Sequence, residues 1–391
     1  MRSIKEIFVI GYGPSSSHTM GPAKACDYIL EQYQNIKHVD ITLFGSLALT
    51  GKGHLTDYIL NLKLKNIEHK LIFDTKTKTK HPNTMQFTVT TDKGTFTEKI
   101  VSIGGGTIVT KHNYVDIEKD VFPHNTLREI LEYCSANSLS LKDYVKKYEN
   151  ESIHNYLKAC KDQILSSIDS GLNKDDYLPG PLKVKRKAKE MFANLQNDDP
   201  AEIMAISAFA VAEENASGNK IVIAPTCGSA GVFGGILGYF RKKNYSEEQI
   251  IDALMVAGLI GILAKTNACV SGAEAGCQAE IGVACAMGAA AIACIKGLNN
   301  DKIARAAEIA LEHSLGLTCD PVQGYVQIPC IERCAIYSLK AKNAAKLAAL
   351  IPSSNNKVSF DDSLKTMYET GKDLSSGYRE TGEKGLGEIF K

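Results

Sequence analysis

Apolar and polar positions alternate in the first part of the chain, as they do in half-buried strands. Residues 85–90 alternate with a period of two, and residues 95–101 repeat this pattern after the turn sequence at 92–94. A shorter apolar run at 41–44 also predicts a strand, whereas residues 21–34 have the spacing of a helix. This part of the chain therefore predicts a mixed α/β domain.

After Pro123 the apolar positions recur at helical spacing instead. Asn125 or Thr126 can cap a helix that begins at Leu127. One short strand is predicted at 221–224. Further helices are predicted at 153–170, 184–197, 201–215, 247–264, 279–295, 302–314 and 340–349. The pattern predicts an α+β protein, with a small α/β domain at 1–122 and a larger, mainly α-helical domain at 123–391.

Composition argues against nucleic-acid-binding, membrane and secreted classes of protein. The 45 Lys and Arg nearly balance the 44 Asp and Glu, so no basic patch predicts a nucleic-acid or acidic membrane partner. The N-terminus lacks the apolar core of a signal peptide. Residues 281–295 form the longest weakly polar stretch, which is too short to span a bilayer and predicts a buried helix. We expect a cytoplasmic protein.

The cysteines are numerous and clustered. Eight of the 11 lie between Cys227 and Cys334. In a reducing compartment they are poor candidates for disulfides, and a single buried cysteine is commonly a packing residue. The clustering favours a thiolate-ligated metal centre. No CxxC pair predicts a zinc ribbon or a ferredoxin arrangement, and no HExxH motif predicts catalytic zinc.

Two loops of small and polar residues precede predicted helices and could bind a carboxylate through hydroxyl and N–H groups. The first occupies residues 13–22, and a loop that only caps its helix is the alternative interpretation. Its polar residues are Ser15, Ser16, Ser17, His18 and Thr19. The second occupies residues 224–231 and contains Thr226 and Gly228.

Two glycine-rich segments could carry a catalytic residue or bind a nucleotide. His54 follows the segment 45–53, where a histidine near a strand end can act as a base at neutral pH. That segment is not a P-loop, because Lys52 is followed by Gly53 and not by Ser or Thr. Residues 102–107 do not match the dinucleotide-binding glycine pattern, so a tight loop is expected there.

Eight segments together resemble the iron–sulfur-dependent L-serine dehydratases, in the same order and over nearly the whole chain. They read GPSSSHTMGP, FGSLALTGKGH, HPNTM, SIGGG, APTCGSAG, SGAEAGCQAE, CDPVQGYVQIPCIER and TGKDLSSGYRET. The chain is similar to the single-chain form of this family, in which a β-type domain is fused ahead of an α-type domain.

The resemblance implies a 4Fe–4S cluster held by Cys277, Cys319 and Cys330, with the fourth iron open to substrate. Cys334 departs from the family pattern, where an asparagine is expected after the IER sequence. It lies four residues after Cys330, which puts both on one face if this segment is helical. A fourth ligand at Cys334 is therefore an alternative, and it would close the open position.

The resemblance also implies deamination of L-serine to pyruvate and ammonia by a homodimer. His54 is the first candidate for the base that removes the Cα proton, and His18 and His81 are candidates for orienting substrate or moving protons. The two loops would hold the substrate carboxylate. Their candidate residues are Ser15, Ser16, Ser17, Thr19, Thr226 and Gly228.

Three other functions stay open at this point. A pyridoxal-phosphate dehydratase would perform the same reaction, but its lysine and phosphate loop are not evident in the sequence. A related cluster-dependent lyase could act on L-cysteine or L-threonine. A non-catalytic iron–sulfur redox sensor would not need the histidines or the carboxylate-binding loops.

Overall fold

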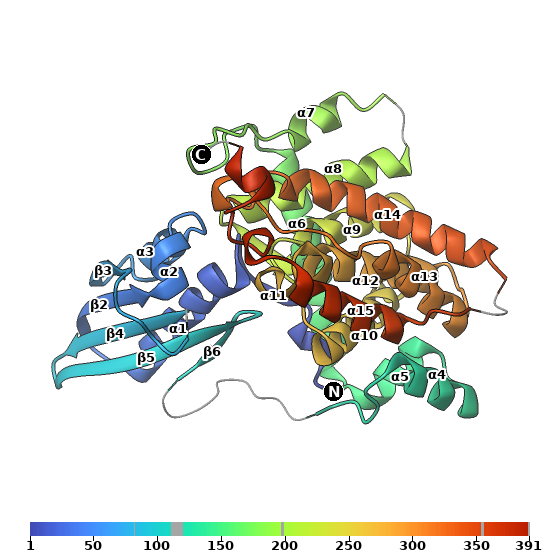
Figure 1. Cartoon of the computed structure of the whole chain (residues 1–391), viewed down its shortest axis with the longest axis horizontal. Helices are drawn as coiled ribbons and strands as arrows, with labels where there is room; N and C mark the ends of the chain where they lie inside the picture. Colours follow the sequence, from blue (N-terminus) through green and yellow to red (C-terminus); the bar gives the residue numbers. More distant parts are fainter. Residues whose placement is uncertain (82, 111–119, 197–198, 353–355, 390–391) are drawn as a thin grey trace.

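The computed structural model describes residues 1–81, 83–110, 120–196, 199–352 and 356–389. A small sheet-containing body lies beside a larger helical body (Figure 1). The α+β class expected from the pattern is confirmed.

The small body is built on one five-stranded sheet with the strand order β3-β2-β4-β5-β6. β2 pairs parallel to β3, and the other neighbours are antiparallel. The predicted hairpin is confirmed, with Thr91 opposite Gly94. The strands are β2 (Ile36–Phe44), β3 (Glu68–Asp74), β4 (Thr84–Thr91), β5 (Gly94–Gly104) and β6 (Thr107–Val109).

The period of two places one face of this sheet in a hydrophobic core. Val39, Ile41 and Leu43 of β2 are fully buried, as are Met85 and Phe87 of β4. Two helices, α1 (Gly21–Gln32) and α3 (Thr56–Lys63), contribute to the same core, and the short α2 (Gly45–Thr50) follows β2 directly. The glycine run after β5 forms the turn into β6, where Gly105 and Gly106 both have positive φ.

The N-terminal segment joins the two bodies. β1 (Val9–Tyr12) pairs antiparallel with β7 (Lys220–Ile223), so the predicted strand at 221–224 is confirmed with a shift of one residue. Ile4, Ile7 and Phe8 are buried in the larger core. The chain therefore begins on the large body, forms the small body and then returns.

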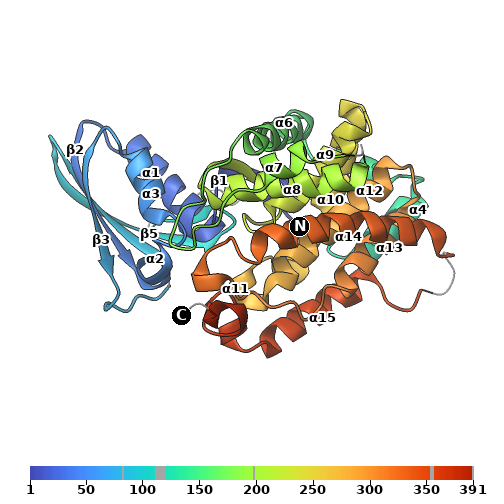
Figure 2. The ribbon, with the colours of Figure 1, turned by 90° about the horizontal axis from the view of Figure 1, so that it is seen from above.

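The large body is a packed helical assembly (Figure 2). Its helices are α4 (Leu127–Ala136), α5 (Leu141–Tyr148), α6 (Ser152–Leu172), α7 (Ala188–Ala193), α8 (Pro200–Ala216), α9 (Ala230–Lys242), α10 (Glu247–Asn267), α11 (Gly272–Ala275), α12 (Val283–Ile295), α13 (Asn300–Glu312), α14 (Cys330–Leu350) and α15 (Phe360–Asp373). Two apolar stretches, Glu247–Asn267 and Gln278–Ile295, are long enough to cross a membrane, but they are 83% and 94% buried in the protein. Both are core helices, as predicted for residues 281–295.

Two helix predictions were wrong in extent. Of the helix expected at 184–197, only α7 forms. The residues before it are extended, because the Leu178 N–H donates to the Val184 carbonyl and the Arg186 N–H donates to the Asp176 carbonyl. Asn197 lies outside the described residues. The helix expected at 340–349 begins earlier, at Cys330.

The helix expected after the loop at 224–231, for which the pattern set no bounds, is α9, and it contains four glycines that lower helix propensity. These glycines let α9 lie against α8 at close range. A Cβ atom on Gly234 would be 2.6 Å from the Val211 side chain, and one on Gly238 would be 2.2 Å from Ser207 Oγ. Tertiary packing overrides the local preference here.

Candidate active site

The serine-rich loop forms a π-helical turn, η2 (Ser16–Met20), that leads into α1. The Ser15 hydroxyl accepts a hydrogen bond from the His18 N–H at 3.2 Å, and the Ser15 N–H donates to Thr19 Oγ1 at 3.2 Å. Ser102 Oγ donates to the Ser17 carbonyl at 2.8 Å. A Cβ on Gly21 would lie 2.0 Å from Ser102 Oγ, so this glycine permits the close approach of β5. The loop is thereby fixed from both sides.

His18 is buried in this loop with both ring nitrogens satisfied. Its Nδ1 lies 2.8 Å from Ser17 Oγ, and its Nε2 lies 2.9 Å from Ser46 Oγ on α2. Burial, and then the neighbouring His54, lower the pKa of His18 to about 3. His18 is therefore neutral at physiological pH.

His54 stacks beside His18, with the ring centroids 4.8 Å apart. Its Nδ1 lies 3.1 Å from the Thr50 carbonyl oxygen, which can only accept, so Nδ1 carries the hydrogen. Nε2 then holds a lone pair, is buried, and has no hydrogen-bond partner within the described part of the chain. Burial lowers the pKa of His54 and keeps it neutral. This leaves one free basic atom in an otherwise satisfied pair.

A group of thiols and a carboxylate lies in the large body. The ligating atoms of Cys277, Glu280 and Cys319 all lie within 4.8 Å of one another, and all three residues are buried or nearly so. Cys319 Sγ lies 3.9 Å from Glu280 Oε2. Gly276 has φ +73°, and a Cβ there would be 2.7 Å from the Leu317 carbonyl, so this glycine lets the two cysteine-bearing segments meet.

Cys330 is the first residue of α14 and is half-buried. Burial, and then the charge of Cys277, raise the pKa of its thiol, which places it in the electrostatic neighbourhood of this group. The hydrogen bond from Cys319 lowers the pKa of Cys277 and raises that of Cys319. Cys277 is thus the thiol most ready to ionise.

Two buried carboxyls border the thiols. Burial and the neighbouring Glu380 raise the pKa of Glu280 to about 8, and burial with Cys277 raises that of Glu380 to about 7. Soft thiolates with an adjacent carboxylate are a donor set that iron–sulfur clusters and other thiophilic metals accept. The residues present therefore fit an iron–sulfur cluster.

The loop after β7 connects the histidine pair with the thiols. Cys227 Sγ lies 3.6 Å from Sδ of Met20, two residues after His18. A Cβ atom on Gly228 would lie 3.6 Å from Glu280 Oε1, so this carboxyl lies beside the loop. The Gly228 carbonyl accepts from Cys334 Sγ at 3.2 Å. The serine-rich loop and the cysteine group therefore border one region between the two bodies.

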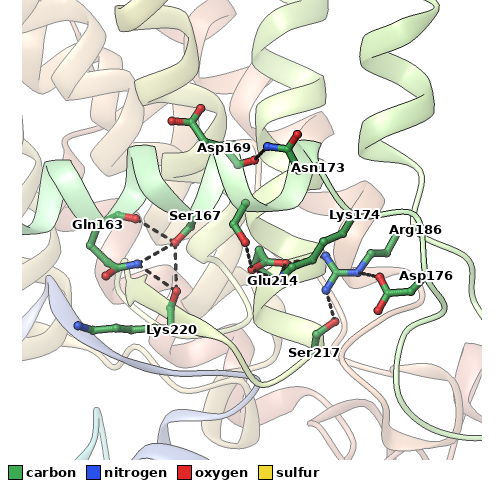
Figure 3. Close-up of polar contacts among 11 residues, drawn as sticks. Gln163, Ser167, Asp169, Asn173, Lys174, Asp176, Arg186, Glu214, Ser217 and Lys220 are labelled. Atoms are coloured by element: carbon green, nitrogen blue, oxygen red, sulfur yellow. Dashed lines mark hydrogen bonds and ion pairs between the residues drawn. The ribbon is translucent and has the colours of Figure 1, made fainter.

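A polar network fixes the start of β7, the strand that leads into this loop (Figure 3). Ser167 Oγ and Gln163 Nε2 of α6 donate to the Lys220 carbonyl at 3.1 and 3.2 Å, at the first residue of β7. Glu214 of α8 accepts from Lys174 and from the buried Arg186. These contacts fix α6, α8 and β7 relative to one another.

His81 and Cys334 were also considered from the sequence, and their contacts differ from those of the other candidate residues. His81 makes its recorded hydrogen bonds within its own loop, where Nδ1 accepts from the Asn83 N–H at 3.1 Å and the carbonyl accepts from Thr84. Pro82 of the HPNTM motif lies outside the described residues. Cys334 is buried, and its thiol donates to the Gly228 carbonyl.

Sequence reasoning did not single out Glu280, Arg333 or Glu380. Each lies inside a motif that carried the family resemblance: CQAE, CIER and YRET. Glu380 also has φ +60°, an uncommon value for a residue with a side chain. A charged residue within a segment that carries the family resemblance was the available signal.

Two cavities in the described part of the chain lie away from the histidines and cysteines. One of about 340 Å³ is lined by Lys161, Arg241 and Tyr245, among others, and one of about 100 Å³ by Phe209, Glu213 and Gln327. The candidate site is identified by the chemistry of its side chains.

Two family models match the chain. The model described as serine dehydratase beta chain matches residues 3–69, and the model described as serine dehydratase alpha chain matches residues 75–387. The chain is 37% identical to the L-serine dehydratase of Haemophilus influenzae, over 99% of this chain and 98% of the relative. It is 38% identical to that of Helicobacter pylori, over 100% and 99%. It is 37% identical to L-serine dehydratase 1 of Escherichia coli, over 99% and 98%.

Proposed function

Because the chain belongs to the serine dehydratase family of lyases, we propose that it deaminates L-serine to pyruvate and ammonia with a 4Fe–4S cluster. Cys277, Cys319 and Cys330 hold that cluster. The observation that carries the proposal is the convergence of the Cys277 and Cys319 thiols with Glu280 inside 4.8 Å. The half-buried Cys330 beside them completes the three-thiol set.

His54 is the base in this proposal. Its neutral ring has the lone pair of Nε2 free, and the hydrogen bond to the Thr50 carbonyl keeps the other nitrogen protonated. Nε2 takes the Cα proton of serine. The electron pair of that C–H bond forms the Cα–Cβ double bond, and the hydroxyl leaves Cβ with its bonding pair. It receives the proton back from His54 and is released as water. The aminoacrylate product then hydrolyses to pyruvate and ammonia without further help from the protein.

A bound cluster with one open iron would act as a Lewis acid toward the serine hydroxyl and make it a better leaving group. Cys334 donates to the Gly228 carbonyl, which supports a cluster held by three cysteines and not four. The fourth position then stays free for substrate.

The two loops hold the substrate carboxylate through hydroxyl and N–H groups. The residues assigned to this role are Ser15, Ser16, Ser17, Thr19, Thr226 and Gly228. His18, held between Ser17 and Ser46, orients the loop and His54. His81 is a further candidate for proton transfer, although its recorded contacts are local.

We further propose a cytoplasmic homodimer whose partner is the small molecule L-serine, with no nucleic-acid or membrane partner. The near balance of charges and the burial of the two apolar helices support this. We divide the chain into a β-type domain at 1–122 and an α-type domain at 123–391, with β1 paired to β7 of the large body.

The test is anaerobic reconstitution with iron and sulfide, followed by assay of pyruvate release from L-serine. The His54→Ala variant should bind as much iron as wild type and lose about 10²- to 10⁴-fold in turnover, the usual contribution of a general base. Release of 2-oxobutyrate from L-threonine or of sulfide from L-cysteine at a higher rate would reassign the substrate. Full iron loading with no lyase activity on any of the three would favour a redox sensor.

A further inference from the structure

Arg333 lies among the three segments that carry the proposed cluster ligands. It lies in the first turn of α14, three residues after Cys330. Its Nη1 donates to the carbonyl oxygen of Thr318, the residue before Cys319, at 3.0 Å. The guanidinium also lies within electrostatic range of the Cys277 thiol. One side chain therefore joins the Cys319 and Cys330 segments and brings its charge near the third.

Arg333 also brings a positive charge to this group. The groups around it are the thiols of Cys277, Cys319, Cys330 and Cys334 and the carboxyl of Glu280. Thiolates that bind a cluster close together repel one another unless a cation offsets their charge, and Arg333 is placed to do so.

We propose that Arg333 is a positioning residue that holds the Cys319 and Cys330 segments in register for cluster assembly and raises the reduction potential of the bound cluster. The inference rests on the proposed cluster at Cys277, Cys319 and Cys330. Arginine suits both tasks because its planar fork carries five donors at fixed angles and stays charged. Lysine would keep the charge, but it lacks the rigid fork that reaches two segments at once.

The experiment compares Arg333→Met, Arg333→Lys and wild type after anaerobic addition of iron and sulfide. We measure iron bound per chain as a function of added iron, and the midpoint reduction potential of the bound cluster. Arg333→Met should weaken iron binding about ten- to a hundredfold, the range for residues that orient metal ligands. It should also make the potential more negative, because the lost positive charge no longer favours the added electron. Arg333→Lys should keep the potential near wild type and still bind iron more weakly.

Arg241→Met is the matched control. Arg241 pairs with Asp169 at 2.7 Å in an exposed position on α9, so its loss should change neither readout. Circular dichroism of each variant before reconstitution reports the fold separately.

Wild-type iron binding and potential in Arg333→Met would overturn the inference. If Arg333→Met fails to fold, Arg333→Lys decides, and wild-type iron binding in that variant overturns the positioning role. If wild type itself takes up no iron and sulfide, the proposed cluster fails as a whole, which is a different result from a wild-type-like Arg333→Met.

Discussion

The histidine pair and the cysteine group are organised in opposite ways. His18 and His54 are neutral, and three of their four ring nitrogens are satisfied by Ser17, Ser46 and Thr50. The cysteine group gathers thiols and two carboxyls near the positive charge of Arg333. The first region satisfies every ring nitrogen but one, whereas the second collects the donor atoms of several ionisable groups in one place.

This difference indicates which region depends on an added group. A buried polar network that is satisfied internally is rigid and can present one reactive atom, here Nε2 of His54. Buried thiols and carboxyls without enough counter-charge are costly unless something binds them. Changes in the cysteine group should therefore affect iron binding, and changes in the histidine pair should affect stability and turnover.

The largest expected effect is at the cysteines. Cys277→Ala and Cys319→Ala should each lose stable iron binding and lyase activity, because two thiolates do not hold a cluster that needs three. The readouts are iron per chain and pyruvate release after anaerobic reconstitution.

Cys334→Ala provides the contrast, because the thiol of Cys334 donates to the Gly228 carbonyl. It should keep wild-type iron content. Loss of iron in this variant would make Cys334 a ligand and close the open position. Cys160→Ala, deep in the large core, controls for simple loss of packing.

A smaller effect is expected from Ser46→Ala, which removes the partner of His18 Nε2. A buried nitrogen left without its hydrogen bond costs about 1–3 kcal/mol in the free energy of unfolding. Urea denaturation measures this cost, and iron content should not change. A parallel loss of iron would contradict the separation of the two regions.

The smallest effect is a pH dependence of stability that arises from the histidine pair. His18 has a pKa of about 3 in the folded protein against an ordinary value of 6.5, so between these values the unfolded chain binds more protons. The stabilisation is complete above pH 6.5 and falls with decreasing pH by about 1.4 kcal/mol per unit. Burial lowers the pKa of His54 as well, which adds to the same slope.

Urea denaturation of protein before reconstitution, at pH 7 and at pH 5.5, measures this slope. His18→Gln should flatten it, and His81→Gln, at a more exposed position, should change it less. An unchanged slope in His18→Gln would show that the histidine pair is not the origin of the pH dependence.

The sequence by itself determined the class of the fold and the identity of most candidate residues. Alternation at 85–90 and 95–101 predicted β4 and β5, and helical spacing predicted α8, α10 and α12. These patterns are local, so they are visible without the fold. Local patterns did not set the bounds of α9 or reveal the extended segment before α7. Contacts between the α9 glycines and α8, and hydrogen bonds with residues 176–178, decide these two structures.

Only the tertiary structure decided how the candidate residues are used. The sequence offered three histidines, and the hydrogen bond to the Thr50 carbonyl left Nε2 of His54 as the free atom. The pairing of His18 with Ser46, and of Arg333 with Thr318, joins different segments of the chain. Side-chain partners depend on long-range packing, which no local pattern of apolar and polar positions encodes.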